Sequence, residues 1–363
     1  VFKELDYKDF AKISGDFNSL HWDDEFAGKT IFQKPIVPLK LSCAPLSRVA
    51  GMIFPGEPSL FLTSNVKAIK PIFYDQEITY TARIESISES TNILGIRVLA
   101  FCLNQVLIDA FIEVKVLSDS WEFKKDEEVK FLSNQKVNEY YLVTGSTGEI
   151  GSAISLKLAN EGYKLILLYR NDGDKKEELK NNLDKIKASY QFIKIDLNSC
   201  DFKKSFKEEF SKIKVLNGIS GIVHTASPDI DEDLTKLVKV NYSSLVDITS
   251  ELLPHMLIRQ SSLIIFISSI AVFKQIEGWH DYIAAKTMAT SFMSGLNLKY
   301  SKYGIKCTTI FPGLVQTKYS EKYRGNQTAL LPGELAEEIT NLDSKNPPEI
   351  IRLEVNNRQC GTY

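Results

Sequence analysis

The chain has 363 residues, of which 44% are hydrophobic and 25% are charged, and its formal net charge is -2. At about 100–200 residues per domain this length predicts two domains, and the composition excludes a disordered chain. The near-neutral charge disfavours nucleic-acid binding, which usually accompanies a clear basic excess.

The chain has no CxxC pair, and its cysteines are Cys43, Cys102, Cys200, Cys307 and Cys360. An odd number of cysteines at irregular spacing predicts free thiols rather than a disulfide framework or a zinc site. No apolar run approaches the ~18 residues that a membrane helix needs, and residues 1–10 lack a signal-peptide pattern. We therefore expect a cytoplasmic protein without a metal, a membrane contact or a nucleic-acid partner.

The first part of the chain reads as a helix-like stretch followed by strands. Apolar and polar residues alternate over 77–84, 94–101 and 107–116, which is typical of an antiparallel sheet. Residues 118–138 are rich in Lys, Glu and Asp without a clean period. We interpret 1–118 as one domain and 119–138 as a linker.

From residue 139 the pattern changes to strand-like apolar runs that alternate with helix-like segments, including a helix from Ser152. The expected strands are 140–143, 165–168, 192–195, 221–223, 263–267 and 307–310. Strands separated by helices form right-handed βαβ units. Residues 139–363 are therefore predicted to form an α/β domain with a Rossmann-type, doubly wound parallel sheet.

A glycine-rich loop at residues 144–151 follows the first expected strand of this domain and opens a helix. Glycines let the backbone approach a pyrophosphate, and the helix N-terminus offers free N–H groups. A tight turn without a ligand is the alternative, but the place between a strand and a helix favours a dinucleotide site. The contacts expected here are Gly145, Ser146, Thr147, Gly148, Ile150 and Gly151.

The second expected strand ends at Tyr169 and Arg170, where an NAD-preferring fold would carry an acid. A guanidinium group matches the extra phosphate of NADP, so we expect NADPH or NADP as the cofactor. An ordinary surface arginine is the alternative interpretation. Asp196 and Leu197, after the third strand, are expected beside the adenine.

Ser269, Tyr282 and Lys286 carry the expected chemistry. Tyr282 and Lys286 are four residues apart on an expected helix and therefore lie on one face. An ammonium group near a phenol favours the phenolate and lowers the tyrosine pKa, which prepares it for proton transfer. Ser269 follows a parallel strand, at the edge where such sheets place their sites.

With these residues in place, the C-terminal part resembles the short-chain dehydrogenase/reductase family, and in particular its NADPH-type 3-oxoacyl-thioester reductases. The resemblance implies that Ser269 polarises the carbonyl, NADPH delivers hydride and Tyr282 gives the proton. It also implies that Lys286 holds the nicotinamide ribose and lowers the pKa of Tyr282. Asn241 matches the family's structural and proton-relay asparagine. The residues that match its nicotinamide-carboxamide segment are Pro312, Gly313 and Thr317.

The chain departs from that family at two places. Glu149 replaces the middle glycine of the TGxxxGxG loop, and the loop fits TGxxGxxG instead, as in the nucleotide-sugar branch. A carboxylate near phosphates is unfavourable unless it points away. The family's Asn-Asn-Ala-Gly is replaced by residues 224–227, where we expect His224 to be a loop or core residue.

In the N-terminal domain, Asp16 and His21 are five residues apart and could share one water or one α-proton, which suits hydration beside a carbonyl. A helix-capping aspartate beside a surface histidine is the alternative. Residues 5–117 as a whole resemble the MaoC-like, R-specific enoyl-thioester hydratases of the α+β hotdog fold, in which a long helix is wrapped by an antiparallel sheet. The resemblance implies that Asp16 and His21 are the catalytic pair, with Asn18 supporting the loop.

Here too the chain departs from the family, because Pro38, Leu39 and Lys40 stand where His-Gly-Met is usual. Leu39 keeps an N–H for an oxyanion contact, but the preceding proline could misplace it. The domain is therefore expected to be catalytic. The alternative is a domain that only binds acyl groups or drives dimerisation.

The two resemblances share one intermediate, and fusion would raise its effective concentration. We expect a bifunctional enzyme that reduces a 3-oxoacyl thioester to the (R)-3-hydroxyacyl thioester with NADPH and dehydrates it reversibly to the trans-2-enoyl thioester. The substrate carrier, coenzyme A or acyl carrier protein, stays open, and a homodimer or homotetramer is expected. The alternatives are a single-activity ketoreductase with a hotdog scaffold, a nucleotide-sugar reductase or epimerase, and a non-enzymatic NADPH sensor.

Overall fold

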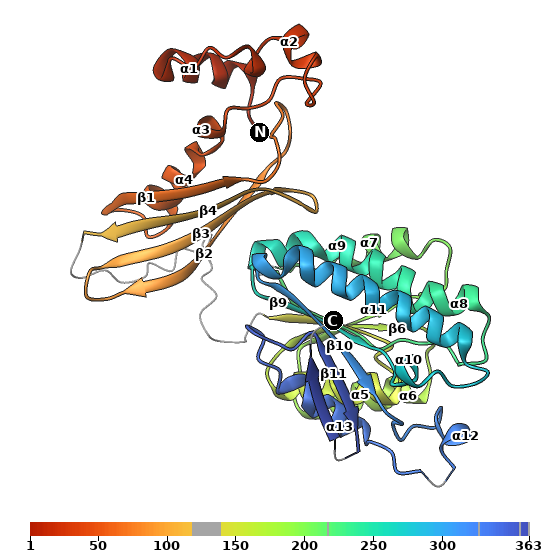
Figure 1. The fold of residues 1–363 in the computed structure, drawn as a ribbon. Coiled ribbons are helices and arrows are strands. Elements are labelled where there is room, and N and C mark those ends of the chain that lie inside the picture. Colours follow the sequence, from red (N-terminus) through yellow and green to blue (C-terminus); the bar gives the residue numbers. More distant parts are fainter. Residues whose placement is uncertain (118–138, 216–217, 326, 356, 362–363) are drawn as a thin grey trace. The chain divides into compact units, whose positions relative to one another are not determined.

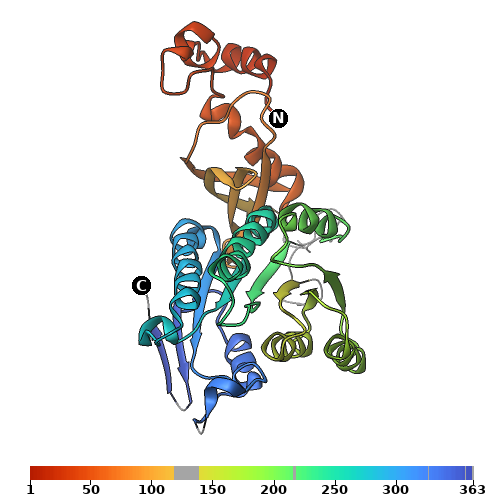
Figure 2. The same ribbon diagram turned by 90° about the vertical axis from the view of Figure 1, so that its right-hand side faces the viewer.

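The computed structural model describes residues 1–117, 139–215, 218–325, 327–355 and 357–361. The chain divides into two compact units, Val1–Phe131 and Leu132–Tyr363, and each has its own sheet (Figures 1 and 2). The linker expected over residues 119–138 lies outside the described residues.

The N-terminal unit is a four-stranded antiparallel sheet in the order β1-β4-β3-β2, with short helices before it. The strands are β1 (Ser59–Ala68), β2 (Thr79–Ser88), β3 (Ile93–Cys102) and β4 (Gln105–Val116). The helical elements are α1 (Glu4–Ser14), the 3-10 turn η1 (Ser19–His21), α2 (Asp24–Gly28), α3 (Leu39–Ser42), α4 (Ala44–Arg48) and the π-turn η2 (Val49–Ile53). This is the expected α+β, hotdog-like architecture.

The core of this unit lies between the run α3-α4-η2 and one face of the sheet. Alternate residues of β3 and β4 face the helices, so that Leu94 pairs with Val114 and Ile96 with Ile112. Leu46 packs against them from α4. Burial of each such side chain contributes about 1.5–3 kcal/mol.

The sheet of the N-terminal unit covers the short segments α3, α4 and η2, where a single long helix was expected. Pro45 lies in the first turn of α4, and α3 ends at Ser42. Because proline has no N–H and its ring clashes with the carbonyl four residues earlier, one continuous helix through this point is disfavoured. The covered helix is therefore a run of short segments.

The C-terminal unit is an eight-stranded sheet in the order β12-β11-β10-β9-β8-β5-β6-β7. Its strands are β5 (Tyr140–Thr144), β6 (Lys164–Tyr169), β7 (Tyr190–Lys194), β8 (Ile219–His224), β9 (Ser262–Ile267), β10 (Ile305–Pro312), β11 (Ile350–Glu354) and β12 (Asn357–Gly361). All neighbouring pairs are parallel except β11 with β12. The expected doubly wound parallel sheet is thus confirmed, and the expected strands all overlap it.

Helices cover both faces of this sheet (Figure 1). One face carries α5 (Glu149–Asn160), α6 (Asp174–Lys185) and α13 (Pro332–Thr340), and the other carries α7 (Phe202–Ser211), α9 (Ser244–Arg259) and α11 (His280–Tyr300). Shorter elements are α8 (Leu234–Val238), the π-turn η4 (Lys239–Ser243), α10 (Ala271–Lys274), the 3-10 turn η5 (Ser301–Tyr303) and α12 (Glu321–Arg324). The helix expected from Ser152 begins earlier, at Glu149.

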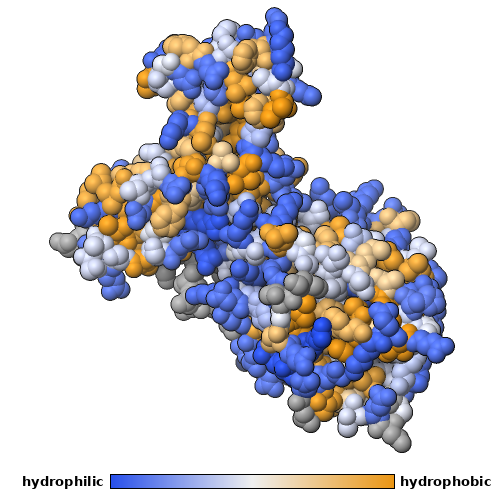
Figure 3. All heavy atoms as spheres, in the orientation of Figure 1, coloured by the Kyte–Doolittle hydropathy of each residue, from blue (hydrophilic) through white to orange (hydrophobic). Residues whose placement is uncertain are grey.

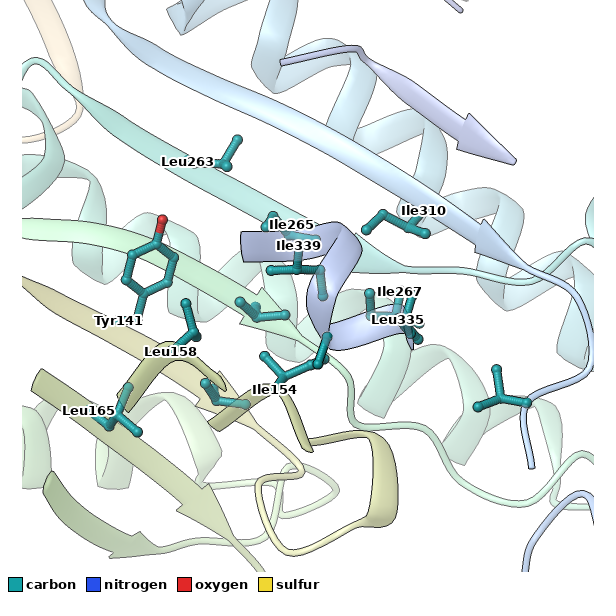
Figure 4. Packing of buried hydrophobic residues seen from close by; sticks show 14 of the residues in the cluster. Tyr141, Ile154, Leu158, Leu165, Leu263, Ile265, Ile267, Ile310, Leu335 and Ile339 are labelled. Atoms are coloured by element: carbon teal, nitrogen blue, oxygen red, sulfur yellow. The ribbon is translucent and has the colours of Figure 1, made fainter. Parts of the chain in front are cut away.

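One part of the core lies between the sheet and helices α5 and α13 (Figure 4). Ile154 and Leu158 are four residues apart on α5 and project from one face of the helix. Ile265 and Ile267 on β9 alternate toward the same layer. The apolar residues repeat every four positions on the helix and every two on the strand, so the two faces pack together and hold the parallel strands in place.

Strand β5 lies between β6 and β8, which is where the strand order reverses. At such a switch point the loops that follow neighbouring strands turn to opposite faces and leave a crevice at the carboxyl edge of the sheet.

Across the residues that the structure describes, no helix is long and apolar enough to span a bilayer.

Candidate active site

A cleft of about 590 Å³ opens at this carboxyl edge, a size within the ~300–1,000 Å³ typical of ligand sites. The loops after β5, β6, β7, β8, β9 and β10 all contribute to its lining. The expected site residues that line it are Gly145, Thr147, Gly148, Ile150, Gly151, Tyr169, Arg170, Asp196, Leu197, Ser269, Tyr282, Lys286, Pro312, Gly313 and Thr317.

The glycine loop forms a tight cradle at the start of α5. Gly145 has a φ of 62°, and a Cβ there would lie 2.9 Å from the Cα atom of Ala226. A Cβ on Gly151 would lie 2.2 Å from the Gly145 carbonyl oxygen, so neither position admits a side chain without a backbone shift. The N–H groups of the first turn of α5 have no partner within the helix, and they form a site for an anion.

Ser146, expected as a cofactor contact, lies outside the lining. It is fully buried, and both its backbone N–H and its hydroxyl donate to the Leu168 carbonyl, at 3.1 and 3.0 Å. Ser146 therefore joins the glycine loop to β6 instead of facing the cleft.

Two cations line the cleft beyond the end of β6. Arg170 and Lys175 are both exposed, and neither side chain has an ion pair or hydrogen bond with another described residue. The nearby carboxylate of Asp172 is already engaged by Lys194, Lys176 and the Tyr169 hydroxyl. These hydrogen bonds, with that from Lys194 the largest contribution, lower the pKa of Asp172 to about 2. Arg170 and Lys175 thus remain available to a phosphate; Lys175 was not expected from the sequence.

Ser269, Tyr282 and Lys286 meet at the centre of the cleft. Ser269 follows β9, while Tyr282 and Lys286 lie on α11 and are 8% and 2% exposed. The Lys286 Nζ atom donates to the Ile267 carbonyl oxygen at 2.8 Å and lies 5.7 Å from the centre of the Tyr282 ring.

Burial governs the charge of these groups. It raises the pKa of Tyr282 to about 12, against the lowering effect of a hydrogen bond with Ser269. Burial also lowers the pKa of Lys286 to about 7. The expected lowering of the tyrosine pKa by the lysine is therefore wrong for this structure, because the ammonium is itself destabilised by burial and is directed at a carbonyl.

Asn241 is fully buried in η4, and Val240, not Asn241, lines the cleft. The Asn241 side-chain nitrogen donates to the Leu237 carbonyl at 2.9 Å. The Asn241 side-chain oxygen has no hydrogen-bond partner among the described residues. A buried amide oxygen without a partner is costly, and it is suited to bind a water molecule.

His224 fixes the turn that holds Asn241. Its Nε2 atom lies 3.0 Å from the Val240 carbonyl oxygen and its Nδ1 atom 3.1 Å from the Thr144 hydroxyl. The carbonyl accepts, so the proton is on Nε2 and Thr144 donates to Nδ1. Burial, helped by the charge of Lys286, lowers the pKa of His224 to about 3. The expectation of a core histidine agrees with this neutral, fully buried ring.

Near Tyr282 the cleft is lined by aromatic residues that were not expected from the sequence, namely Trp279, Tyr319 and Tyr323. The Trp279 ring lies 6.2 Å from Tyr282 and 5.2 Å from Tyr323. Trp279 precedes Tyr282 by three residues, which places both on one side of the start of α11. That spacing was a usable signal, whereas Tyr319 and Tyr323 reach the cleft from a loop.

In the N-terminal unit, Asp16 lies close to His21, the last residue of η1. The His21 Nε2 atom lies 3.9 Å from an Asp16 carboxylate oxygen, and Nδ1 donates to the Ile36 carbonyl at 2.8 Å. Asn18 caps η1 by accepting from the Leu20 N–H at 3.0 Å. The pair is therefore brought together, with the imidazole oriented by a backbone carbonyl. Leu39 begins α3, where first-turn N–H groups have no partner within the helix.

Comparison with known proteins explains the C-terminal geometry. The sequence model "short chain dehydrogenase" matches residues 139–328, more than half of the chain. The chain belongs to the short-chain dehydrogenase family. A second sequence model, "MaoC like domain", matches residues 2–97, so the chain combines a MaoC-like domain with a short-chain dehydrogenase domain.

Relatives of the short-chain dehydrogenase domain include two reductases that are named for acyl compounds. The very-long-chain 3-oxoacyl-CoA reductase of Mus musculus is 29% identical over 199 residues, which cover 52% of this chain and 64% of that protein. The NADPH-dependent 1-acyldihydroxyacetone phosphate reductase of Schizosaccharomyces pombe is 26% identical over 201 residues, 53% of this chain and 65% of that protein. The chain thus spans less than two thirds of the length of these relatives.

A 3-oxoacyl (acyl-carrier-protein) reductase from Agrobacterium tumefaciens C58, solved with NADP bound, has a similar structure. Its TM-score is 0.54 at 22% identity, and the match covers 65% of this chain and 100% of that one. At this identity the likeness shows the fold of the short-chain dehydrogenase domain.

Proposed function

We propose that this chain reduces a 3-oxoacyl thioester to the (R)-3-hydroxyacyl thioester with NADPH and reversibly dehydrates the product to the trans-2-enoyl thioester. The observation that carries the reductase is that Ser269, Tyr282 and Lys286 face the same cleft as the glycine cradle. The observation that supports the dehydratase is the Asp16–His21 pair in the MaoC-like domain.

The residues of the cleft fit a dinucleotide phosphate. Added Cβ atoms at Gly145 and Gly151 would collide with backbone, so the loop keeps its N–H groups accessible to a pyrophosphate. Arg170 and Lys175 would bind the additional phosphate of NADPH, Asp196 and Leu197 would flank the adenine, and Pro312, Gly313 and Thr317 would hold the carboxamide. The names of the Schizosaccharomyces relative and the Agrobacterium structure support NADPH over NADH.

The bound cofactor would supply hydride to the carbonyl carbon. On the protein side, Ser269 donates a hydrogen bond to the carbonyl oxygen and Tyr282 transfers its proton to the same oxygen as charge develops there. A tyrosine whose pKa lies at about 12 keeps its proton at neutral pH, which suits a donor in reduction. Lys286, with a pKa of about 7, holds the nicotinamide ribose and returns a proton toward Tyr282, and Asn241 holds the water for this relay.

Dehydration of the 3-hydroxyacyl product needs a base for the α-proton and an acid for the leaving hydroxyl. His21 and Asp16 supply these groups, with Asn18 fixing the loop between them. The Leu39 N–H would bind the thioester oxygen in place of the usual glycine amide. The proposed substrate is an acyl-CoA or an acyl-carrier-protein thioester, as the names of the relatives suggest.

The test uses full-length protein, NADPH and acetoacetyl-CoA, with NADPH loss and crotonyl-CoA formation followed separately. We expect Tyr282→Phe to slow NADPH loss about 100-fold or more, the effect of removing a positioned proton donor, with NADPH binding retained. We expect His21→Ala to leave NADPH loss unchanged and to stop enoyl formation.

Each outcome separates the alternatives. Unchanged enoyl formation in His21→Ala would leave a ketoreductase with a MaoC-like scaffold. Unchanged NADPH loss in Tyr282→Phe would remove the proposed reductase centre, and turnover of nucleotide sugars in place of thioesters would replace the substrate class.

A further inference from the structure

Glu149, which stands where the family loop has a glycine, joins the cofactor side of the cleft to its substrate side. It is the first residue of α5, directly after Gly148, and it lines the cleft. Its carboxylate accepts a hydrogen bond from the backbone N–H of Lys318 at 2.8 Å, across 169 residues of sequence. Lys318 lies between Thr317 and Tyr319, which both line the cleft.

The segment that Glu149 holds carries the aromatic wall over Tyr282. Residues 315–320 form a compact turn, in which the Ser320 hydroxyl donates to the Val315 carbonyl at 2.5 Å. Tyr319, one residue after Lys318, lines the cleft, and so does Tyr323. The Lys318 backbone is therefore one of the points that position this wall, and the Tyr319 hydroxyl is also hydrogen-bonded to the backbone of Ile230.

The other end of the same segment is fixed to the opposite side of the cleft. Lys322 lies 2.8 Å from Asp229 and 3.0 Å from Asp231, and the Tyr323 hydroxyl lies 3.3 and 3.0 Å from the same two carboxylates. These contacts anchor the segment to the loop after β8. Among the contacts described here for this segment, that of Glu149 comes from the loop that would bind the cofactor phosphates.

The Glu149 carboxylate also affects the phosphates themselves. It lies at the start of α5, beside the N–H groups proposed to bind the pyrophosphate. Two negative charges in one partly enclosed site repel each other more strongly than in water. The same side chain thus stabilises the substrate wall and opposes the anionic cofactor.

We propose that Glu149 is a positioning residue that fixes the wall formed by Tyr319 and Tyr323, and that it lowers the KM for the ketone while it weakens NADPH binding. This inference rests on the proposed reductase function. In this proposal the hydrogen bond to Lys318 affects the ketone, whereas the negative charge affects NADPH. Substitution of Glu149 by glutamine and by alanine separates the two effects.

The experiment compares Glu149→Gln with Glu149→Ala in the full chain. Glutamine keeps an oxygen that can accept from the Lys318 N–H and removes only the charge, whereas alanine removes both. Kd for NADPH is measured by fluorescence, and KM and kcat are measured with acetoacetyl-CoA at saturating NADPH. Glu334 gives a matched control, because its carboxylate also accepts a backbone N–H, that of Leu331 at 2.7 Å, in the first turn of a helix, and it does not line the cleft.

We expect both Glu149 variants to bind NADPH about threefold to tenfold more tightly, with a gain that shrinks as salt screens the charge. The ketone KM should rise about fivefold or more in Glu149→Ala, where the hydrogen bond is lost, and should stay within about twofold in Glu149→Gln. Glu334→Gln should change neither constant.

A ketone KM in Glu149→Ala within about twofold of the unchanged protein would overturn the inference, as would weaker NADPH binding in Glu149→Gln. Parallel weakening of both ligands would show general loosening and would overturn it as well. Failure of the unsubstituted chain to bind NADPH or to reduce acetoacetyl-CoA would instead reject the proposed function.

Discussion

At the centre of the short-chain dehydrogenase domain, burial sets the charge of three titratable side chains. Tyr282 keeps its proton because its pKa is about 12, His224 stays neutral because its pKa is about 3, and Lys286 changes charge near a pKa of about 7. Desolvation is the first cause in each case. A phenol that keeps its proton is suited to proton donation near neutral pH.

The neutral imidazole of His224 predicts a pH dependence of stability. Its pKa is about 3 in the folded chain against 6.5 ordinarily, so between these values the unfolded chain binds a proton that the folded chain excludes. The stabilising contribution is therefore complete above pH 6.5 and falls as the pH drops toward 3, by up to about 1.4 kcal/mol per pH unit.

Substitution of His224 by Asn, the residue usual in the family, should flatten this dependence. We expect His224→Asn to lower the free energy of unfolding at about pH 7.5 by roughly 1–3 kcal/mol, since the bonds to Thr144 and Val240 are lost. Below about pH 6 its stability should fall less steeply than that of the unchanged chain. Urea unfolding at about pH 7.5 and below about pH 6 measures the free energy of unfolding of both proteins. If it fell equally with pH in both, a neutral buried histidine would be contradicted.

Residue spacing predicted part of this centre. Tyr282 and Lys286 are a local pair, because four residues on one helix lie on one face whatever the rest of the fold does. The direction of the Tyr282 pKa shift could not be predicted in the same way, since it depends on how many atoms from other elements remove the phenol from water.

At the scale of elements, the connection from β6 to α6 separates two uses of charge. Lys176 and Lys194 are paired with Asp172, while Arg170 and Lys175 line the cleft. Asp172 is the acid that the sequence places between Arg170 and the start of α6. Its pairing with the two lysines holds it in a network with the Tyr169 hydroxyl. Arg170 and Lys175 are the cations proposed to bind the additional phosphate of NADPH.

Removal of both free cations should change cofactor preference. We expect Arg170→Ala combined with Lys175→Ala to raise the KM for NADPH about 10-fold to 100-fold and to leave the KM for NADH within about twofold, because only NADPH carries the additional phosphate. Steady-state kinetics with each cofactor measure the ratio. Lys180→Ala, at an exposed position on α6 outside the cleft, is the control. Equal losses with both cofactors would contradict the assignment.

Strongly patterned elements were predictable, and weakly patterned ones were not. Strands β3, β5, β6 and β8 to β10 carry apolar runs, and they are largely buried. Strand β1 is largely exposed and β12 is entirely exposed, so neither shows the pattern of a buried strand. Their pairing with β4 and β11 is a tertiary fact that no local signal carries.

At the scale of the whole molecule, the N-terminal unit has an exposed apolar strand at the edge of its sheet. Leu60, Phe61 and Leu62 on β1 are 50%, 36% and 40% exposed, and β1 pairs only with β4. Apolar side chains also gather on the surface of this unit in the view of Figure 3. An edge strand with unpaired backbone groups and apolar side chains favours pairing with another chain.

We therefore expect self-association of the chain through β1, as a dimer or, with a second interface, a tetramer. Light scattering of the full chain should give at least twice the monomer mass, and Leu62→Lys should reduce it, because a charge on an edge strand opposes pairing. Lys67→Arg, on the same strand, is the control. A monomeric chain, or an oligomer unaffected by Leu62→Lys, would reject this interface.

The sequence alone determined the two-domain plan, the classes of both sheets and the spacing of the residues proposed for the reductase, because periodicity and short spacings are local properties. Only the tertiary structure decided the charge states of Tyr282 and Lys286, the engagement of Glu149 with Lys318 and the aromatic wall beside Trp279. Each of these depends on atoms brought together from distant parts of the chain, and desolvation and long-range contacts leave no pattern in a single segment.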